Sequence, residues 1–404
     1  MKKDFDVVVI GAGINGQVMS LAASHVGFSV ALIDQNRFIE DSLRDFDGRA
    51  YAVAFSSVQM MKNLNLWKKI EGTAQPISNI KVSHGTIERG PASATLQFNN
   101  ADIEESPMAQ MLEDRFLRQC LIQEIKGNKL IDLIEQRKII KIDETNKQKQ
   151  LTLDNSSKLK TSLIVASDGI NSPTAKAFGI KKAGWKYKQR GLVCAVNHEY
   201  SSNNTAYQYF LPEGPLAILP IKNNTASIVW TESIQNAATI SEMSEAEYLS
   251  VLQNRFGDFL GKLKLTGKRL SFPLKLSISE KYVSDKFAVI GDAAHGYHPI
   301  AGQGLNAGLR DIAALVDVIS CARERGEDFS SINILNRYQE WRRFDNQTLG
   351  FATDNLNKIF SSYDPLFGSL KNLGMKMIDK SNRAKRVFMR QAAGLNGDLP
   401  KLMR

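Results

Sequence analysis

The run GDAAHGYHPIAGQGLNAGLRD, residues 291 to 311, concentrates residue types that bind metals and cofactors. Asp292, His295 and His298 are all common metal ligands, and five glycines lie among them. A zinc site would need further ligands at a defined spacing such as HExxH, and no such spacing occurs here. We therefore expect no metal. We interpret Asp292 as an acceptor for sugar-like hydroxyls, the glycines as a surface for a flat ring, and the histidines as hydrogen-bonding residues around it.

The residues around this run predict the elements that position it. The apolar stretch KFAVI comes before Gly291 and reads as a buried strand, so Asp292 should stand at the carboxyl end of that strand, where open α/β sheets bind ligands. The sequence from Pro299 onward reads as a glycine-bearing loop that leads into a long helix. Backbone N–H groups at such a helix start can stabilise negative charge on a ligand.

A second candidate site lies at the N-terminus of the chain. FDVVVI reads as a buried strand, GAGING follows it, and a helical pattern begins at once. In this arrangement Gly11 permits the tight turn, Gly13 lets a phosphate approach the backbone, and Gly16 allows close packing of helix on strand. The next strand ends in Asp34, 18 residues after Gly16, where an acid takes the ribose hydroxyls. These features predict a bound adenine dinucleotide, either NAD or FAD.

A third stretch, SDGINSP, follows another apolar strand and starts a short helix. Asp168 and Gly169 lie at the end of that strand. This stretch is also an ordinary loop and helix cap, so by itself it predicts no ligand.

Composition indicates a globular protein of more than one domain. The 404 residues include 52 lysines and arginines against 42 aspartates and glutamates, and no apolar run approaches the ~18 residues of a membrane-spanning helix. Nine of the basic residues, against two aspartates, lie in 366–404. The folded body is therefore not expected to bind nucleic acid. Three separated cysteines, Cys120, Cys194 and Cys321, predict neither a disulfide framework nor a zinc site, as in a reducing cytosol.

The three motifs GAGING, SDGINS and GDAAHGYHPIAGQGLN occur in an order that resembles the class A flavoprotein monooxygenases with the para-hydroxybenzoate hydroxylase fold. Within this class the chain is most similar to the ubiquinone-biosynthesis hydroxylase family. Three further stretches carry the similarity: DGRAYAVAFSSVQMMKNLNLW, LEDRFLRQCL and FLPEGPLAILPI. The resemblance spans roughly residues 5 to 345.

The resemblance implies FAD as cofactor and assigns its contacts residue by residue. The pyrophosphate and the adenosine ribose would be held by Gly11, Gly13, Gly16 and Asp34, and the phosphates or the flavin side by Arg49 and Arg115. Asp292 would bind the ribityl chain. The residues along the isoalloxazine ring would be Pro299, Gly302, Gly304, Leu305 and Asn306. Asp168 and Gly169 match the motif associated with both FAD and nicotinamide-cofactor binding.

One position departs from the family pattern. The family commonly has an arginine shortly after its DG motif, and here Ala175 stands in that place with Lys176 beside it. If that arginine helps the nicotinamide cofactor to dock, reduction of the flavin would be weakened here or would depend on Lys176.

The dispersed motifs must meet on one ligand, so the predicted fold is α/β with a Rossmann-like FAD-binding domain of discontinuous segments, 1–75, 105–182 and 275–345. An antiparallel-sheet substrate domain, 76–104 and 183–274, would form a roof over the flavin. Residues 346–404 would form a C-terminal helical, basic amphipathic segment. Its apolar positions are Leu366, Phe367, Leu370, Leu373, Met377 and Ile378, and its basic ones are Lys371, Lys376, Lys380, Arg383, Lys385 and Arg386.

The reaction implied by the resemblance is that of an NAD(P)H- and FAD-dependent monooxygenase. FAD would be reduced by NAD(P)H, would react with O₂ to a C4a-hydroperoxide, and would transfer one oxygen to a polyprenylated phenol in ubiquinone biosynthesis. The sequence identifies no general base, no ring position, no length of the prenyl tail and no oligomeric state, and it does not distinguish NADH from NADPH. Three alternatives remain: a monooxygenase of a small soluble aromatic, a flavin-dependent halogenase, which the absence of a WxWxIP motif disfavours, and a catalytically idle flavin-binding subunit of a biosynthetic complex.

The basic tail has two interpretations. A basic amphipathic helix binds anionic membrane surfaces, and it can equally pack on the body of its own protein with its charges in water. For a family with polyprenylated substrates, membrane contact or contact with other ubiquinone-biosynthesis proteins is favoured. We therefore expect a cytoplasmic protein that is peripheral to the inner membrane.

Overall fold

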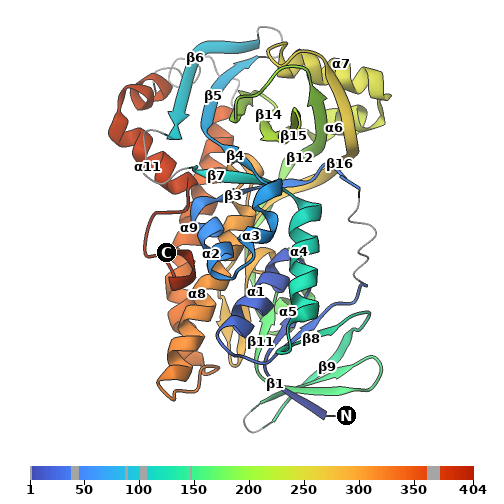
Figure 1. Ribbon diagram of the computed structural model, residues 1–404, viewed down its shortest axis with the longest axis vertical. Helices are drawn as coiled ribbons and strands as arrows, with labels where there is room; N and C mark the ends of the chain where they lie inside the picture. Colours follow the sequence, from blue (N-terminus) through green and yellow to red (C-terminus); the bar gives the residue numbers. More distant parts are fainter. Residues whose placement is uncertain (1, 38–44, 87–89, 101–106, 146–147, 362–373) are drawn as a thin grey trace.

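The computed structural model describes residues 2–37, 45–86, 90–100, 107–145, 148–361 and 374–404. Two halves are stacked along the long axis (Figure 1). One half holds a largely parallel sheet with helices packed on it. The other holds a second, strongly twisted sheet and helices α6 (Ile234–Glu242) and α7 (Glu245–Phe256).

The first sheet is built around three parallel strands that carry the predicted motifs at their carboxyl ends. Its strand order is β17-β18-β11-β1-β2-β8, with β10 and β9 added beside β11. The strand bounds are β1 (Lys2–Ile10), β2 (Val30–Ile33), β8 (Ile131–Ile134), β9 (Ile139–Glu144), β10 (Lys149–Leu153), β11 (Lys158–Ala166), β17 (Val283–Ser284) and β18 (Phe287–Val289). Val7, Val8 and Val9 of β1 are fully buried, because parallel strands in the middle of such a sheet are covered on both faces.

Helices from distant parts of the chain form a layer on this sheet (Figure 1). They are α1 (Ile14–His25), α4 (Asp114–Gly127), α8 (Gly304–Glu324) and α9 (Ile332–Phe360), with the short α5 (Pro173–Ala177) after β11. Helix α1 lies between α4 and α8, and α9 packs on α8. One hydrophobic core unites these helices with the strands. The half is therefore assembled from segments that are separate in the sequence, as predicted.

The second sheet has the order β19-β16-β12-β15-β14-β13-β5-β6. Its strands are β5 (Asn79–Thr86), β6 (Gly90–Asn99), β12 (Lys182–His198), β13 (Thr205–Leu211), β14 (Gly214–Ile221), β15 (Thr225–Ser233), β16 (Leu263–Ser279) and β19 (His295–Gly296). All its pairings are antiparallel except that of β13 with β5, which is parallel. The fold class predicted from the sequence, an α/β dinucleotide-binding part with an antiparallel-type second sheet, is confirmed, with this one parallel pair as the difference.

A third, three-stranded sheet joins the two halves. It consists of β3 (Ala50–Ala54), β7 (Ala109–Glu113) and β4 (Gln75–Ile77), and the helices α2 (Phe55–Asn63) and α3 (Trp67–Ile70) follow β3. In Figure 1 this sheet lies across the middle of the molecule.

The C-terminal segment packs on the body through one side of its helix. Helix α11 (Asn382–Ala392) places Met389 in a buried cluster with Met375, Leu96, Phe98 and Met108. Ile378 packs against the same cluster, whereas Met377 is exposed. The predicted apolar residues Leu366, Phe367, Leu370 and Leu373, and the basic Lys371, lie outside the described residues. None of the helices in the described part of the chain combines the length and hydropathy needed to cross a bilayer.

Candidate functional site

A single cavity connects the three predicted motifs. Its volume is about 1880 Å³. Ordinary small-molecule sites have volumes of roughly 300–1,000 Å³, so this cavity has room for more than one ligand. It begins at the loop after β1, passes the ends of β11 and β18, and continues beneath the second sheet.

The glycines of the first motif have different physical tasks at the start of α1. Gly11 has φ +95°, and a Cβ there would lie 2.7 Å from the backbone nitrogen of Asp168. A Cβ at Gly13 would meet nothing within 4 Å, so this glycine opens onto the cavity that it lines. Gly16 does not line the cavity and instead lets α1 pack on the preceding turn. Helix α1 has no side-chain cap and no acid in its first turn, so its N–H groups are available to an anion.

Asp34 lies at the end of β2 and faces the same end of the cavity. Its carboxylate accepts hydrogen bonds from the backbone N–H of Ala12, at 2.7 Å, and of Asn36, at 2.8 Å. These bonds orient the carboxylate beside the glycine turn. A carboxylate has about four acceptor sites, so two bonds leave it able to accept ribose hydroxyls.

The second motif forms a tight loop in which Asp168 is both a cavity residue and a cap for α5. Its carboxylate accepts from the Ser172 hydroxyl and, at 3.1 Å, from the backbone N–H of Thr174. Gly169, with φ +87°, makes the turn and lines the cavity. Ala175 is buried, and Lys176 is exposed and does not line the cavity. A role of Lys176 in docking a nicotinamide cofactor would therefore be played at the protein surface and not inside the cavity.

A different lysine, which the sequence did not single out, links the second and third motifs. Nζ of Lys182, at the start of β12, donates to the carbonyl oxygen of Ile170 at 3.0 Å and to that of Asp292 at 3.3 Å. Burial, together with Lys275 nearby, lowers the pKa of Lys182 to about 8, although Asp168 and Asp292 oppose the shift. Burial likewise raises the pKa of Asp292, which lines the cavity, against the effects of His295 and Lys182.

The wall expected for a flat ring is formed by the 3-10 turns Gly291–Ala293 and Pro299–Ala301 and by the first turn of α8. All five predicted ring residues line the cavity: Pro299, Gly302, Gly304, Leu305 and Asn306. The side chain of Asn306 also has partners within the protein. It accepts from the Ala54 N–H and the Ser57 hydroxyl and donates to the Ala52 carbonyl oxygen. Asn306 thus ties α8 to β3 and α2.

The two histidines of the third motif behave differently from one another. Nε2 of His295 lies 2.6 Å from the Asp311 carboxylate, as expected for a hydrogen-bonding residue. Neither ring nitrogen of His298 has a partner among the described residues, and its ring instead packs edge-on against Tyr187. Burial, opposed by Asp354, lowers the pKa of His298 to about 4. No protein partner supports the hydrogen-bonding role expected of His298, which stays a prediction. No cluster of metal-ligating side chains occurs in the part of the chain that the structure describes.

The two predicted arginines do not reach the cavity. Arg49 pairs with Asp47 at 2.7 Å and with Asp114 at 3.1 Å. Arg115 pairs with Glu113 at 2.7 Å and lies over the rings of Phe46 and Phe116. Arg118, one turn further along α4, lines the cavity instead, with Nε 2.8 Å from the Asp114 carboxylate. The stretch LEDRFLRQCL contains both Arg115 and Arg118. The two side chains leave α4 in different directions, and only that of Arg118 reaches the cavity.

The second sheet roofs the far part of the cavity with alternate residues of its strands. Leu216, Ile218 and Trp230 face α6 and α7 in a closed core. The residues between them face the cavity, and they are mostly small or apolar: Ala206, Gln208, Phe210, Ala217, Leu219 and Val229. The opposite wall comes from α9 with Leu349, Ala352 and Leu356. The cavity thus joins a polar, glycine-lined end to an apolar chamber.

The donors and the space fit an adenine dinucleotide that ends in a flat ring. Two helices, α1 and α8, begin at the cavity, and neither has a side-chain cap. Two carboxylates, Asp34 and Asp292, also line the cavity, and they are suited to accept from the hydroxyls of a ribose and a ribityl chain. No acidic side chain occupies the first turn of either helix, which keeps both N-termini attractive to negative charge.

Comparison with known proteins agrees with this geometry. A family model described as "FAD binding domain" matches residues 4–347. "Ubiquinone hydroxylase UbiL" of Rhodospirillum rubrum is 32% identical, over 99% of this chain and 92% of that protein. "3-demethoxyubiquinol 3-hydroxylase" of Escherichia coli is 29% identical, over 96% of this chain and 98% of that protein. The solved structure of p-nitrophenol 4-monooxygenase PnpA from Pseudomonas putida superimposes with a TM-score of 0.79 at 17% identity, covering 98% and 99% of the two chains.

Proposed function

Because the chain belongs to the FAD binding domain family and, within it, to the flavin-dependent hydroxylases of ubiquinone biosynthesis, we propose that it hydroxylates a polyprenylated phenol with NAD(P)H and O₂. The single observation that carries the proposal is the continuity of the cavity from the dinucleotide loops to the apolar chamber. One end suits a charged cofactor and the other a hydrocarbon-bearing ring.

Bound FAD would supply the redox chemistry, since it accepts two electrons and activates oxygen, and the protein supplies binding and orientation. Gly11, Gly13 and the start of α1 would hold the pyrophosphate, and Asp34 the adenosine ribose. Asp292 would hold the ribityl chain, and the isoalloxazine ring would lie against the turn from Pro299 to Leu305. Asp168 and Gly169, which line the cavity next to Gly11, belong to the same site. Arg118, which lines the cavity, would take the role at the phosphates or the flavin side that the sequence assigned to Arg49 and Arg115.

The apolar chamber would hold the phenol and exclude water. Ala217, Leu219 and Val229 on the roof and Leu349 on α9 present no charge to the ligand. A dry chamber strengthens electrostatic interactions and protects reactive species from hydrolysis. The neutral ring of His298 beside the turn is consistent with such a low-polarity environment.

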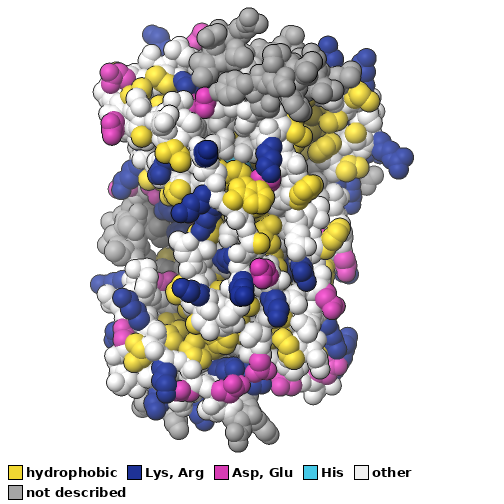
Figure 2. Space-filling model, turned by 180° about the vertical axis from the view of Figure 1, so that it is seen from behind, with side chains coloured by type: hydrophobic (Ala, Val, Ile, Leu, Met, Phe, Trp, Pro, Cys, Tyr) yellow, Lys and Arg dark blue, Asp and Glu magenta, His cyan; other side chains and the backbone are white. Residues whose placement is uncertain are grey.

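Contact with a membrane surface would bring a lipid-tailed phenol to this chamber. On the tail, Met377, Val387 and Phe388 are 65%, 57% and 48% exposed, and Phe388 also lines the cavity. Five basic side chains around them are exposed: Lys376, Lys380, Arg383, Arg386 and Arg390. Figure 2 shows hydrophobic side chains interspersed with Lys and Arg at its upper right, the edge of the molecule at which α11 lies. Each basic residue near an anionic surface contributes about 1 kcal/mol.

The hydroxylase proposal is tested by NAD(P)H oxidation with the FAD-loaded protein, with and without a prenylated phenol, and by mass spectrometry of quinone intermediates in cells that lack the protein. We expect phenol-stimulated oxidation and accumulation of a precursor that lacks one hydroxyl group. If only small soluble phenols stimulate the oxidation, the substrate is a small soluble aromatic and not a polyprenylated phenol. If no phenol gives turnover and the quinone pool is unchanged, the remaining hypothesis is a catalytically idle flavin-binding subunit of a biosynthetic complex.

Membrane contact is tested by co-sedimentation with anionic and with zwitterionic vesicles. The double variant Val387→Ser/Phe388→Ser should reduce binding to the anionic vesicles. Leu130→Ser, an exposed apolar residue between α4 and β8, is the matched control and should bind as the unaltered protein does. Equal binding by all three proteins would exclude α11 as the contact surface.

A further inference from the structure

A buried carboxylate joins the third motif to helix α9. Asp311 of α8 is fully buried, and its two oxygens have separate partners. Oδ2 lies 2.6 Å from Nε2 of His295 and accepts from the Gly291 N–H at 3.1 Å. Oδ1 accepts from Nε of Arg342 at 2.9 Å and from Nδ2 of Asn346 at 3.1 Å. One oxygen therefore holds the loop that bears Asp292 at both of its ends, and the other holds α9.

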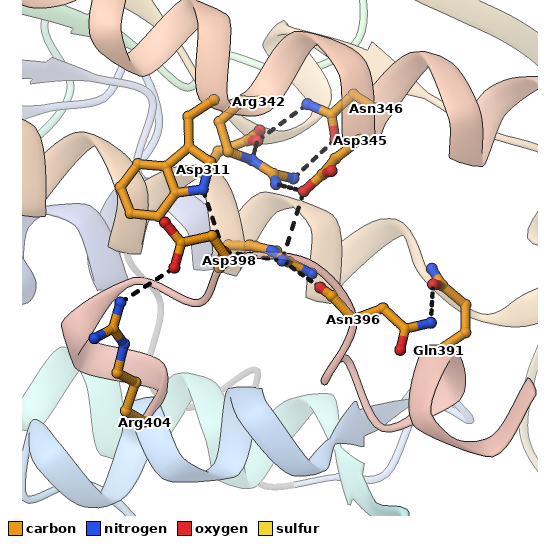
Figure 3. A network of polar contacts seen from close by, with 10 residues as sticks. Asp311, Arg342, Asp345, Asn346, Gln391, Asn396, Asp398 and Arg404 are labelled. Carbon is orange, nitrogen blue, oxygen red and sulfur yellow. Dashed lines mark hydrogen bonds and ion pairs between the residues drawn. The ribbon is translucent and has the colours of Figure 1, made fainter. Parts of the chain in front are cut away.

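The polar chain continues from Arg342 to the C-terminal segment (Figure 3). Nη1 of Arg342 donates to Asp345 at 2.7 Å, and the same Asp345 oxygen lies 3.6 Å from Nη2 of Arg310. That nitrogen of Arg310 donates to the carbonyl oxygens of Asn396, at 2.6 Å, and Asp398, at 3.2 Å. Charges alternate along the whole path from Asp311 to Arg310.

The segment at the end of this path is part of the cavity wall. The segment meant here is 391–404, and the residues within it that line the cavity are Gln391, Ala392, Gly394, Asn396 and Gly397. Ala393 accepts a hydrogen bond from the Ser56 N–H at 3.0 Å, and a Cβ at Gly394 would lie 2.3 Å from the Ser56 hydroxyl oxygen. The segment thus lies directly on the turn between β3 and α2, and it falls beyond residue 347, where the match to the FAD binding domain ends.

We propose that Asp311, Arg342, Asp345 and Arg310 are positioning residues that couple the C-terminal segment to the loop 291–298, so that docking of the segment and binding of FAD stabilise each other. The effect on FAD binding rests on the proposed function. The coupling between the C-terminal segment and the loop 291–298 is independent of that function. A buried guanidinium or carboxylate that loses its partner is strongly destabilised, so a break anywhere in the path disturbs both ends. Since such coupling is reciprocal, whatever orders one end orders the other.

The test compares full-length Arg310→Gln with the unaltered protein by hydrogen–deuterium exchange, first without FAD. Arg310→Gln removes the donors to Asn396 and Asp398, and the amides of 391–404 should exchange faster. The coupling predicts that the amides of 291–298 exchange faster as well, although the hydrogen bonds of Arg310 go to Asn396 and Asp398 and not to this loop. Faster exchange confined to the C-terminal segment would overturn the proposal.

The second measurement is an FAD titration of the deflavinated full-length proteins, followed by flavin fluorescence. We expect Arg310→Gln and Asp345→Asn each to weaken FAD binding by about 5- to 10-fold, in the range of measured couplings between sites. The double variant should lose no more than either single one, because both break the same path. Arg310→Lys, which keeps the charge, should restore part of the affinity.

The control is Arg404→Gln, which breaks an ion pair with Asp398 at the protein surface. It should leave the exchange of 291–298 and the FAD affinity unchanged. An FAD affinity of Arg310→Gln equal to that of the unaltered protein would sink the link to the cofactor. Failure of the unaltered protein to bind FAD would instead sink the proposed function, and the exchange of 291–298 would still decide the coupling.

Discussion

The α-carbon of Gly16 faces the carbonyl oxygen of Gly11 so closely that a Cβ on Gly16 would lie 1.8 Å from that oxygen. At Gly13, two positions after Gly11, a Cβ would meet nothing within 4 Å. Gly11 and Gly16 thus allow α1 to pack on the turn. Gly13 keeps open the space that we assign to the pyrophosphate.

These two glycines should therefore respond differently to alanine. Gly16→Ala should destabilise the fold by about 1–3 kcal/mol, as overpacking does, and lose FAD as a consequence. Gly13→Ala should fold with an unchanged melting temperature and bind FAD at least about tenfold more weakly, a loss of roughly 1.4 kcal/mol. Thermal unfolding and FAD titration measure the two effects. Gly127→Ala, where a Cβ also meets nothing, is the control. If Gly13→Ala binds FAD with normal affinity, the pyrophosphate does not bind at this turn.

The pKa of Lys182 makes stability depend on pH in the alkaline range. Burial, reinforced by Lys275, lowers its pKa from 10.5 to about 8 in the folded protein. Between these two values the unfolded chain holds more protons than the folded one, so the contribution of Lys182 to stability rises with pH. We expect the unaltered protein to gain stability relative to Lys182→Met as pH increases from 8 to 10.5. Since Lys182 is only partly buried, solvent screening reduces the size of the effect.

Denaturation of both proteins at several pH values measures this difference. A constant difference across the range would show that Lys182 keeps its ordinary pKa. Lys176→Met, which alters an exposed lysine outside the cavity, should give a constant difference.

Asp311 makes stability depend on pH in the acidic range, with the same sign as Lys182. Burial alone would raise its pKa, but His295 and Arg342 outweigh burial and lower the pKa from 3.8 to about 2. A carboxylate with a depressed pKa contributes stability that is present above its unfolded pKa and is lost as pH falls through the folded value. Asp311→Asn should cost about 3–5 kcal/mol at neutral pH, because Arg342 loses its buried partner.

The difference in unfolding free energy between the unaltered protein and Asp311→Asn should therefore shrink as pH falls from about 3.8 to about 2. Urea titrations at several pH values in this window measure it. If the difference stays the same down to pH 2, the carboxylate of Asp311 does not have the lowered pKa that its contacts with His295 and Arg342 indicate.

The roof of the chamber offers a test of substrate binding that spares the cofactor. Ala217 on β14 faces the cavity, so Ala217→Phe adds a ring to the chamber without entering a packed core. We expect a higher Michaelis constant for the prenylated phenol, by about tenfold for a loss of roughly 1.4 kcal/mol of binding, with unchanged FAD affinity.

Ile218 is the matched control for this variant. It is the next residue on β14 and faces α6 and α7. Ile218→Val should cost about 0.5–1.5 kcal/mol of stability and leave the Michaelis constant unchanged. If both variants bind the phenol as the unaltered protein does, the chamber is not its site.

The parts of this protein that the sequence by itself determined are local ones. The strand, glycine turn and helix from Phe5 to His25 follow from β-branched and glycine residues within about twenty positions, and the structure has them there. The same holds for the turn and helix after Gly291, because backbone conformation and helix starts depend on neighbouring residues.

Only the tertiary structure decided which side chains share a space. It placed Arg118 rather than Arg115 on the cavity, and Lys182 rather than Lys176 between two motifs. It joined His295 to Asp311, whereas the ring nitrogens of His298 have no partner among the described residues. It also turned one side of the tail, Met375 and Met389, toward the body. Such choices depend on packing between elements far apart in the chain, and a few degrees of helix rotation redirect a side chain without any change in the local pattern.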